Sequence, residues 1–234
     1  MSALHILSGG AAQGLVNQLR GTIYNETGRA VEGHFGAVGL MRDKLLAGEP
    51  CDVLILTQAL IDQLSAGGHV QAGSATPLGV VRTGVAVKSG EPQPKVDTAD
   101  ALKAALLAAQ GIYFPDPVQA TAGIHFMNVL KKLGIAQQVA GALRPFPNGA
   151  TAMKAMAAAS EPGLLGCTQV TEILYTPGVQ LVAALPKEFE LATVYTAAVA
   201  AKAEQPQAAR MMIELLASPA AAEVRRAGGF EQGG

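Results

Sequence analysis

The chain has 234 residues, of which 50% are hydrophobic, 15% are charged and 4% are aromatic, and its formal net charge is −1. This near-neutral charge argues against a nucleic-acid-binding surface and against a basic face that adheres to membranes. A core of Ala, Val, Leu and Ile is typical of a parallel α/β sheet covered by helices, and no apolar run approaches the roughly 20 residues of a membrane span.

The N-terminal part of the sequence alternates between strand and helix. Strands are predicted over residues 4–7, 30–35 and 52–56, and helices over residues 12–27, 40–47 and 58–66. Leu15, Leu19 and Ile23 lie at helical spacing in the first helix, and Gly28 is a suitable stop. Three alternations in succession are typical of βαβ units.

The regular alternation of strands and helices ends after residue 70. Residues 78–88 form a long β-rich run that could leave one lobe and enter the next. Further strands are predicted over residues 111–114, 143–146, 164–168, 179–185 and 194–201, and helices over 98–108, 121–133, 150–159, 205–216 and 220–227. The strand over 194–201 could return the chain to the first lobe, and the sequence from Gly228 onward is expected to be a frayed tail.

Four turns in which a strand passes into a helix stand out. They are Ser8-Gly9-Gly10-Ala11, Gly36-Ala37-Val38-Gly39, the segment from Asp116 to Gly123, and Asn148-Gly149-Ala150-Thr151. The first amides of a helix lack intrahelical partners and coincide with the positive end of the helix dipole, so such a turn can hold an anion. Two turns in each half of the chain predict an anion-binding cleft between two lobes.

The order of these turns along the chain resembles that of a known protein family. Together with Ala47-Gly48-Glu49-Pro50-Cys51-Asp52-Val53, Val85-Ala86-Val87-Lys88 and Thr121-Ala122-Gly123, they resemble the molybdate-binding branch of the type 2 periplasmic solute-binding proteins. The resemblance implies an α/β fold of two lobes, each a mixed or parallel sheet flanked by helices, joined by two crossing hinge strands. Residues 1–80 and 197–234 would form lobe one, residues 81–196 would form lobe two, and the ligand would lie between them.

The resemblance also indicates which branch to expect. Oxyanion binders of this family use hydroxyls from the first two turns, but here only Ser8 supplies one, because the second turn reads Gly36-Ala37-Val38. Thr168-Gln169 stands where the family has a tyrosine, and residues 169–174 resemble a divergent branch that includes aconitate isomerase. We therefore expect a protein that closes on a small oxyanion or carboxylate, with an isomerase that shifts a proton on a tricarboxylate as the alternative.

The candidate ligand-binding residues each have a second interpretation. Ser8 could donate to the ligand or cap its helix, Asn148 could do either, and Gln169 could bond the ligand or its own loop. Arg82 could fork onto a carboxylate, form a salt bridge between the lobes or lie at a solvated edge. The full set is Ser8, Gly9, Gly10, Ala37, Val38, Arg82, Thr121, Ala122, Asn148 and Gln169.

Catalytic candidates are few. Glu172 could act as a general base if it is buried, although a solvated carboxylate at a helix start is the simpler interpretation. His125 could take part in acid–base chemistry or could simply pack. Gly9, Gly10 and Gly14 do not have dinucleotide-binding spacing, and no sequence motif indicates a metal, so we expect no cofactor.

The remaining expectations concern the environment of the protein. Cys51 and Cys167 each lie beside an apolar run and are expected to be buried thiols. Met1-Ser2-Ala3 leads directly into the first strand, which predicts a cytoplasmic location as written, or a periplasmic one if a signal has been removed. The expected partners are a small anion and, for an exported protein, an ABC transporter permease; we expect a monomer that neither binds nucleic acid nor inserts into the membrane.

Overall fold

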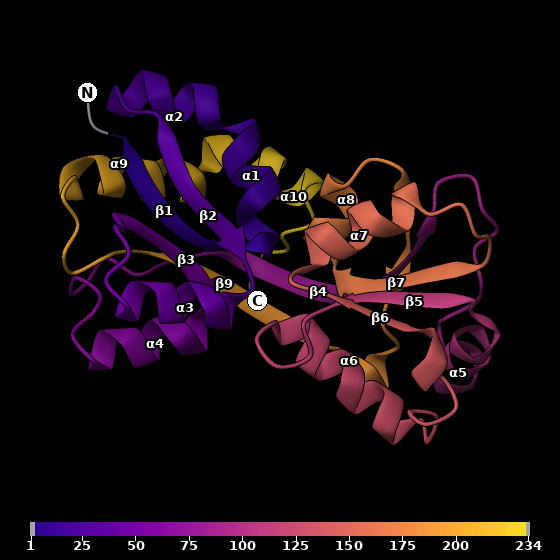
Figure 1. Cartoon of the computed structure of the whole chain (residues 1–234). Helices are drawn as coiled ribbons and strands as arrows, with labels where there is room; N and C mark the ends of the chain where they lie inside the picture. The colour runs from indigo at the N-terminus through magenta and orange to yellow at the C-terminus, as the bar shows by residue number, and fades with distance from the viewer. Residues whose placement is uncertain (1–2, 233–234) are drawn as a thin grey trace. The chain divides into compact units, whose positions relative to one another are not determined.

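A computed structural model describes residues 3–232 of the chain. Its internal contacts divide the chain into two compact units, one formed by Met1–Val81 with Thr193–Gly234 and the other by Arg82–Ala192. The chain passes from the first unit to the second within β4 (Thr76–Lys88) and returns within β9 (Ala192–Val199) (Figure 1).

The first unit is built on a sheet with the strand order β2-β1-β3-β9. Its remaining strands are β1 (Leu4–Gly9), β2 (Val31–Gly36) and β3 (Val53–Thr57). β1 is parallel to both β2 and β3, and Ser8 lies opposite Phe35 on one side and Ile55 on the other. The carboxyl ends of these three strands therefore meet at one edge of the sheet.

Helices flank this sheet (Figure 1). They are α1 (Gln13–Gln18), α2 (Arg20–Thr27), α3 (Val38–Leu46), α4 (Gln58–Ala66), α9 (Pro206–Ala217) and α10 (Ala222–Ala227), with 3-10 turns η1 (Gly10–Ala12) and η4 (Pro219–Ala221). The helix predicted over residues 12–27 is instead divided at Leu19, whose φ of −97° and ψ of 4° leave the helical region. Gly14 and Gly21 lie on either side of this break and lower the helix propensity of the segment.

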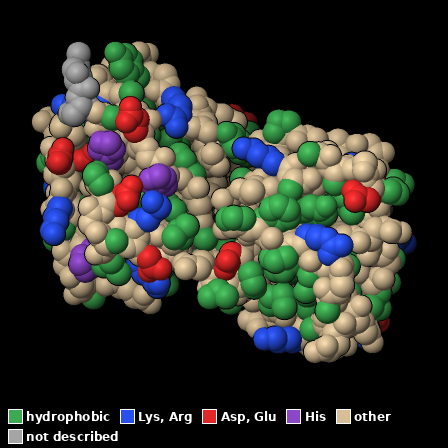
Figure 2. All heavy atoms as spheres, in the orientation of Figure 1, with side chains coloured by type: hydrophobic (Ala, Val, Ile, Leu, Met, Phe, Trp, Pro, Cys, Tyr) green, Lys and Arg blue, Asp and Glu red, His purple; other side chains and the backbone are tan. Residues whose placement is uncertain are grey.

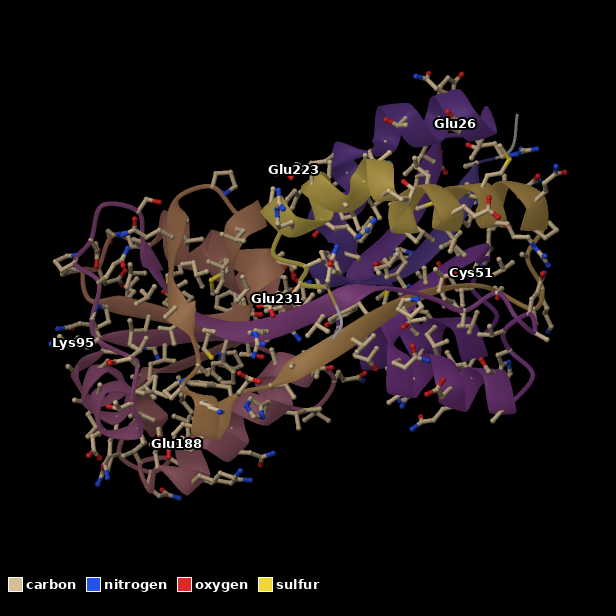
Figure 3. All side chains as sticks on the ribbon, turned by 180° about the vertical axis from the view of Figure 1, so that it is seen from behind. Glu26, Cys51, Lys95, Glu188, Glu223 and Glu231 are labelled. Carbon is tan, nitrogen blue, oxygen red and sulfur yellow. The ribbon has the colours of Figure 1, made fainter. Side chains whose placement is uncertain are left out.

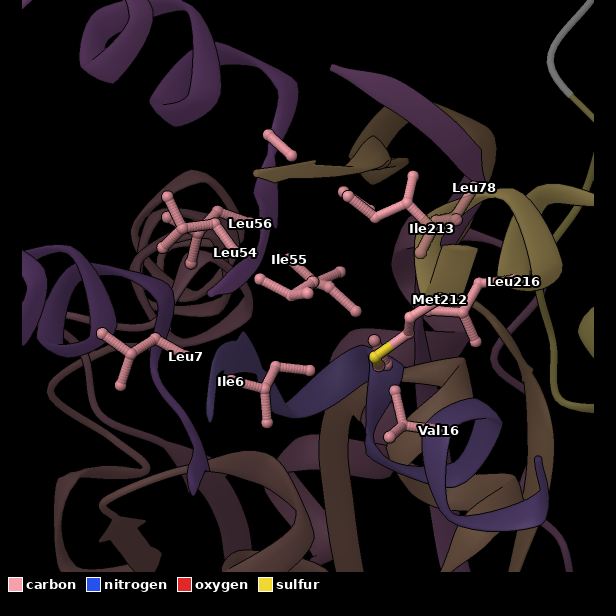
Figure 4. Close-up of a cluster of buried hydrophobic side chains, with 14 of the residues drawn as sticks. Ile6, Leu7, Val16, Leu54, Ile55, Leu56, Leu78, Met212, Ile213 and Leu216 are labelled. Atoms are coloured by element: carbon pink, nitrogen blue, oxygen red, sulfur yellow. The ribbon is translucent and has the colours of Figure 1, made fainter. Parts of the chain in front are cut away.

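The core of the first unit is aliphatic, as the composition predicts. All five residues of β3 are buried, because helices cover both faces of a largely parallel sheet. Ile6, Leu54 and Ile55 of the strands pack in one cluster with Met212 and Leu216 of α9 (Figure 4).

The second unit contains a sheet with the order β4-β7-β5-β6, and β8 also pairs with β4. The strands beside β4 are β5 (Gly111–Pro115), β6 (Leu143–Phe146), β7 (Leu164–Gln169) and β8 (Val179–Ala184). β5 is parallel to β6 and β7, with Pro115 opposite Phe146 and Tyr113 opposite Gly166. As in the first unit, three parallel strands end at one edge.

The helices of the second unit follow these strands. They are α5 (Ala99–Ala108), α6 (Thr121–Lys132), α7 (Gly149–Ala158) and α8 (Val170–Tyr175), with 3-10 turns η2 (Ala140–Ala142) and η3 (Lys187–Phe189). Thr98 caps α5 by accepting a hydrogen bond from the amide of Ala101. Glu188 of η3, labelled in Figure 3, accepts a further bond from the amide of Ala99.

The prediction of a frayed tail from Gly228 onward is wrong for the described residues. Phe230 is buried, and Glu231 forms a β-bridge with Val80 through two backbone hydrogen bonds of 2.8 Å (Figure 3). Gly79 makes this possible, because its φ of 146° suits glycine and a Cβ there would lie 2.7 Å from the carbonyl oxygen of Glu231. Gly233 and Gly234 lie outside the described residues.

Both cysteines are buried thiols, which confirms the prediction. Burial raises the pKa of the Cys51 thiol to about 12, so this group stays protonated at neutral pH. Among residues 3–232, no helix is long and apolar enough to cross a membrane, and no three His, Cys, Asp or Glu side chains gather where they could hold a metal ion.

Candidate functional site

Ser8 is fully buried near the end of β1, in the first of the four turns. Its hydroxyl donates to the carbonyl oxygen of Gly9 at 2.9 Å, and the following 3-10 turn begins at Gly10 with no side-chain cap. The interpretation of Ser8 as a helix cap is therefore wrong. The hydroxyl lies instead in the strand, at the edge where β1, β2 and β3 end.

Gly9 brings two neighbouring segments close to this turn. A Cβ at position 9 would lie 2.8 Å from Cγ1 of Val38 and 3.0 Å from Cε1 of Tyr195. Glycine is needed here for close approach, because the start of α3 and strand β9 both pack on the backbone. Ser8, Gly9, Gly10, Ala37 and Val38 thus lie together in the first unit, as the sequence predicted for two of its turns.

The N-terminus of α3 lacks both a side-chain cap and an acidic residue in its first turn. Ala37 is the N-cap residue and has no side-chain hydrogen bond to the helix, and the first turn contains no acidic residue. By contrast, α4 is capped at the same edge by Thr57, whose Oγ1 accepts from the amide of Leu60 at 3.4 Å. The first amides of α3 are therefore, like those of the turn at Gly10, groups that a bound anion could satisfy.

Sequence reasoning missed the contribution of β9 to this edge. Tyr195 and Thr196 lie opposite Thr57 and Leu56 of β3, and Thr196 donates to the side-chain oxygen of Gln58 at 2.5 Å. A signal was present, because Thr193, Tyr195 and Thr196 interrupt an otherwise small and apolar strand. Its meaning depends on the antiparallel register with β3, which the sequence does not display.

Thr121 and Ala122 begin α6, which follows the end of β5. The N-cap residue Ala120 has no side-chain hydrogen bond to the helix, and the first turn has no acidic residue. Asp116 serves the preceding loop instead, since its Oδ1 accepts from the amides of Val118 and Gln119 at 2.7 Å each. Like α3, α6 therefore begins without a side-chain cap.

Gly123 holds the first turn of α6 against its strand. A Cβ at this position would lie 2.3 Å from the carbonyl oxygen of Pro115 and 2.2 Å from that of Asp116. The tight contact fixes the direction of the helix relative to the end of β5.

The N-terminus of α7 is arranged differently. Oδ1 of Asn148 accepts from the amide and the hydroxyl of Thr151, both at 2.9 Å, so Asn148 is a helix cap. Its side-chain nitrogen is the part of the residue that could still serve a ligand. The capping interpretation of Asn148 is therefore correct, while its ligand role stays a prediction.

Glu172 is buried, so the prediction of a solvated carboxylate is wrong. The Thr168 hydroxyl donates to its Oε2 at 2.5 Å, and the amides of Ala150, Gln169 and Gly149 also donate to the carboxylate. Burial raises the pKa of Glu172, and these four donors oppose the rise by favouring the charged form. The chain thus carries its own carboxylate at the N-terminus of α7.

The other charged candidates have partners within the second unit. Arg82 forms an ion pair with Glu190. Nε2 of His125 donates to the carbonyl oxygen of Phe189 at 2.7 Å and so ties α6 to η3. Gln169 is buried at the end of β7, where it is the N-cap residue of α8. The packing interpretation of His125 agrees with this contact.

Two pockets of the first unit lie away from these residues. One, of about 270 Å³, is lined by His5, Glu49, Asp52 and His69 among others, and the second, of about 470 Å³, includes His5 and Tyr24. Both contain residues from the amino-terminal end of β1, whereas Ser8 and Gly9 lie at its carboxyl end. Neither pocket includes a candidate ligand-binding residue.

Charged side chains of both signs are interspersed on the surface seen in Figure 2. This distribution is consistent with the net charge of −1 and gives no extended basic area on that face.

The comparisons with known proteins define the class. The chain has the mixed α/β fold of the type 2 periplasmic binding proteins, with TM-scores of 0.81 against the periplasmic molybdate-binding protein of Azotobacter vinelandii and 0.76 against the sulfate-binding protein of Mycobacterium tuberculosis. The identities are 18% and 15%; the alignments cover 99% of this chain in both cases, and 100% and 87% of those chains.

The family follows from the sequence. The family described as bacterial extracellular solute-binding protein matches residues 4–231, and the chain belongs to it. The predicted fold class and the predicted solute-binding function are thereby confirmed. The chain is also 28% identical over 231 residues to an aconitate isomerase from Pseudomonas sp., an alignment that covers 95% of this chain and 85% of that protein.

Proposed function

We propose that this solute-binding protein binds a small anion, an oxyanion or a small carboxylate, through helix N-terminal amides and hydroxyl or amide side chains. The observation that carries the proposal is the pair of uncapped helices, α3 in the first unit and α6 in the second. Each begins at an alanine N-cap at the carboxyl end of a parallel strand, where free amides and the helix dipole favour negative charge.

The side chains of the candidate ligand-binding residues support an anion that is held mainly by neutral groups. Arg82 is the only cationic side chain among the ligand-binding candidates, and Glu190 already pairs with it. Ser8, Thr121, Asn148 and Gln169 offer hydroxyl and amide groups. Such groups bind oxygen atoms of an anion without adding a full positive charge.

A ligand screen tests the proposal directly. We would measure the thermal unfolding midpoint with molybdate, tungstate, sulfate, phosphate, citrate, cis-aconitate, trans-aconitate and tricarballylate, and confirm each shift by isothermal titration calorimetry. A ligand at 100 times its Kd is expected to raise Tm by about 5–10 °C in a protein of this size. Absence of binding to all of these anions would contradict the proposal.

Variants in each unit then assign the contacts. Ser8→Ala removes the buried hydroxyl of the first unit, and Thr121→Val removes the hydroxyl at the start of α6 while keeping its amide. We expect Ser8→Ala to weaken binding about tenfold, the value of one hydrogen bond to a charged group. Loss of affinity in only one of the two variants would limit the hydroxyl contribution to that unit.

The second candidate function is isomerisation of a tricarboxylate. The similarity to aconitate isomerase favours it, and Glu172 is a buried carboxyl group with a raised pKa. Incubation with trans-aconitate in D₂O, followed by proton NMR, distinguishes the two functions. Formation of cis-aconitate with incorporation of deuterium would support an enzyme, whereas binding without conversion would support a binding protein alone.

We also propose a place and a partner for the protein. Members of its family are described as extracellular, which supports a location outside the cytoplasmic membrane and delivery of the solute to an ABC transporter permease. Fractionation of cells that express the full gene checks the location. Loss of solute uptake on deletion of the gene, restored by the gene, checks the transport role.

A further inference from the structure

Glu172 contacts two other segments of the second unit, β7 and α7. Its carboxylate receives the Thr168 hydroxyl from β7 and the Gln169 amide that follows it, and it receives the amides of Gly149 and Ala150 from the first turn of α7. All four groups donate hydrogen bonds. A set composed of donors alone is the set that an anion needs and that a neutral amide cannot match.

Gly149 is part of this arrangement. A Cβ at position 149 would lie 2.0 Å from Oε2 of Glu172 and 2.0 Å from Oγ1 of Thr168. The first residue of α7 must therefore lack a side chain for the carboxylate to reach the helix amides. The α7 helix has ten residues, and its N-terminus binds a carboxylate that comes from another element of the same chain.

We propose that Glu172 is a built-in anionic ligand of α7, and that it withholds this helix N-terminus from the solute. Since two negative charges at one helix N-terminus repel each other, an incoming anion is directed away from the amides of Gly149 and Ala150. Asn148 then meets the solute through its side-chain nitrogen only. Glu172 is in this role a positioning residue rather than a general base, and the proposal does not depend on which solute binds.

Chemical rescue tests the proposal. In Glu172→Ala the carboxylate is removed and the four donors remain, so a small anion can take its place. With formate at pH 8, against sodium chloride of equal ionic strength, we expect Tm of Glu172→Ala to rise by about 2–5 °C. Formamide, which has a similar size and no charge, is expected to give no such rise.

Two further variants serve as matched controls. Glu172→Gln keeps the volume of the side chain and blocks the site, and Ile173→Ala opens an apolar cavity at the next position of α8, which is also buried. Neither is expected to respond to formate more than the unmodified protein does. Equal responses in all four proteins, or no response in Glu172→Ala, would overturn the proposal.

A spectroscopic measurement covers the case in which Glu172→Ala does not fold. In Glu172→Gln, the amide proton resonances of Gly149 and Ala150 are expected to move upfield, because they lose a charged acceptor. The amide of Thr151, which bonds Asn148 in the same turn, is the internal reference and is expected to move less. Equal movement of the three resonances would contradict the proposal, whatever the result of the solute screen.

Discussion

The N-termini of α6 and α7 differ although both follow the ends of parallel strands in the same unit. α7 is capped by Asn148 and receives the carboxylate of Glu172. α6 begins at Ala120 with no side-chain cap, and the nearby Asp116 bonds two loop amides instead. Two turns with the same sequence signal thus differ in the hydrogen bonds that the chain makes to their helix amides. Side chains of the protein bond the first turn of α7, whereas α6 has no side-chain cap.

The first unit repeats this contrast in a weaker form. α4 is capped by Thr57, whereas α3 begins at Ala37 without a side-chain cap. Each unit thus contains a helix that a side chain caps (α4, α7) and a helix that begins without such a cap (α3, α6), and α8 and α9 also begin without one. We infer that the absence of a cap is a more specific indicator of an anion site than the turn itself.

The largest expected effect comes from Gly149→Ala. The added Cβ would overlap Glu172 and Thr168, so α7 or the carboxylate must move, and we expect the free energy of unfolding to fall by about 3 kcal/mol. Urea denaturation measures this change. Gly21→Ala is the control, because nothing lies within 4 Å of a Cβ there, and it is expected to stabilise α2 by about 0.5–1 kcal/mol.

The second prediction tests the uncapped helix. Thr121→Pro removes one amide hydrogen at the first position of α6, where proline is tolerated, and Ala120 already has the extended backbone that must precede proline, with φ of −103° and ψ of 127°. We expect the affinity for the solute to fall about tenfold or more, with little change in stability. Calorimetric titration measures the loss, and Thr121→Val, which keeps the amide, separates it from the loss of the hydroxyl.

A third prediction removes the side-chain cap of α7 and adds one to α6. Asn148→Ala removes the cap of α7 and is expected to cost about 1 kcal/mol of stability. Ala120→Ser adds a capping side chain at α6, where it is expected to stabilise the free protein by up to about 1 kcal/mol and to weaken solute binding, because the new hydroxyl competes for the same amides. Equal or tighter binding by Ala120→Ser would contradict a solute site at α6.

The smallest expected effect is a change in pH dependence. Burial raises the pKa of Glu172 in the folded protein above its usual value of 4.5, so its contribution to stability is fully present below that pH and is lost as pH rises through the folded pKa. The unmodified protein is therefore expected to lose stability relative to Glu172→Gln as pH rises from 4.5 through the range in which the folded carboxyl group ionises, and the slope corresponds to at most one proton. Urea denaturation across this range measures it, and a relative gain would mean that the four donors outweigh burial.

Much of the fold could be predicted because its signals are local. The helix predicted over residues 58–66 and the strand predicted over residues 143–146 both match the structure. Gly28 ends its helix in the left-handed conformation, as predicted, since such a stop depends on neighbours in the chain. The docking of Phe230 was missed because its partner lies far away in sequence, on β4.

The sequence by itself determined the alternation of strands and helices, the aliphatic core and the positions of the helix starts, because periodicity and turn residues express themselves within a few residues. Only the tertiary structure decided that the N-terminus of α7, which Asn148 caps locally, also receives a carboxylate from α8. Glu172 reaches Gly149 because β5 lies between β6 and β7 and aligns the ends of the three strands. Ala120, the N-cap residue of α6, makes no side-chain hydrogen bond to its helix, so the same kind of turn is completed by side chains at α7 and is not capped by one at α6.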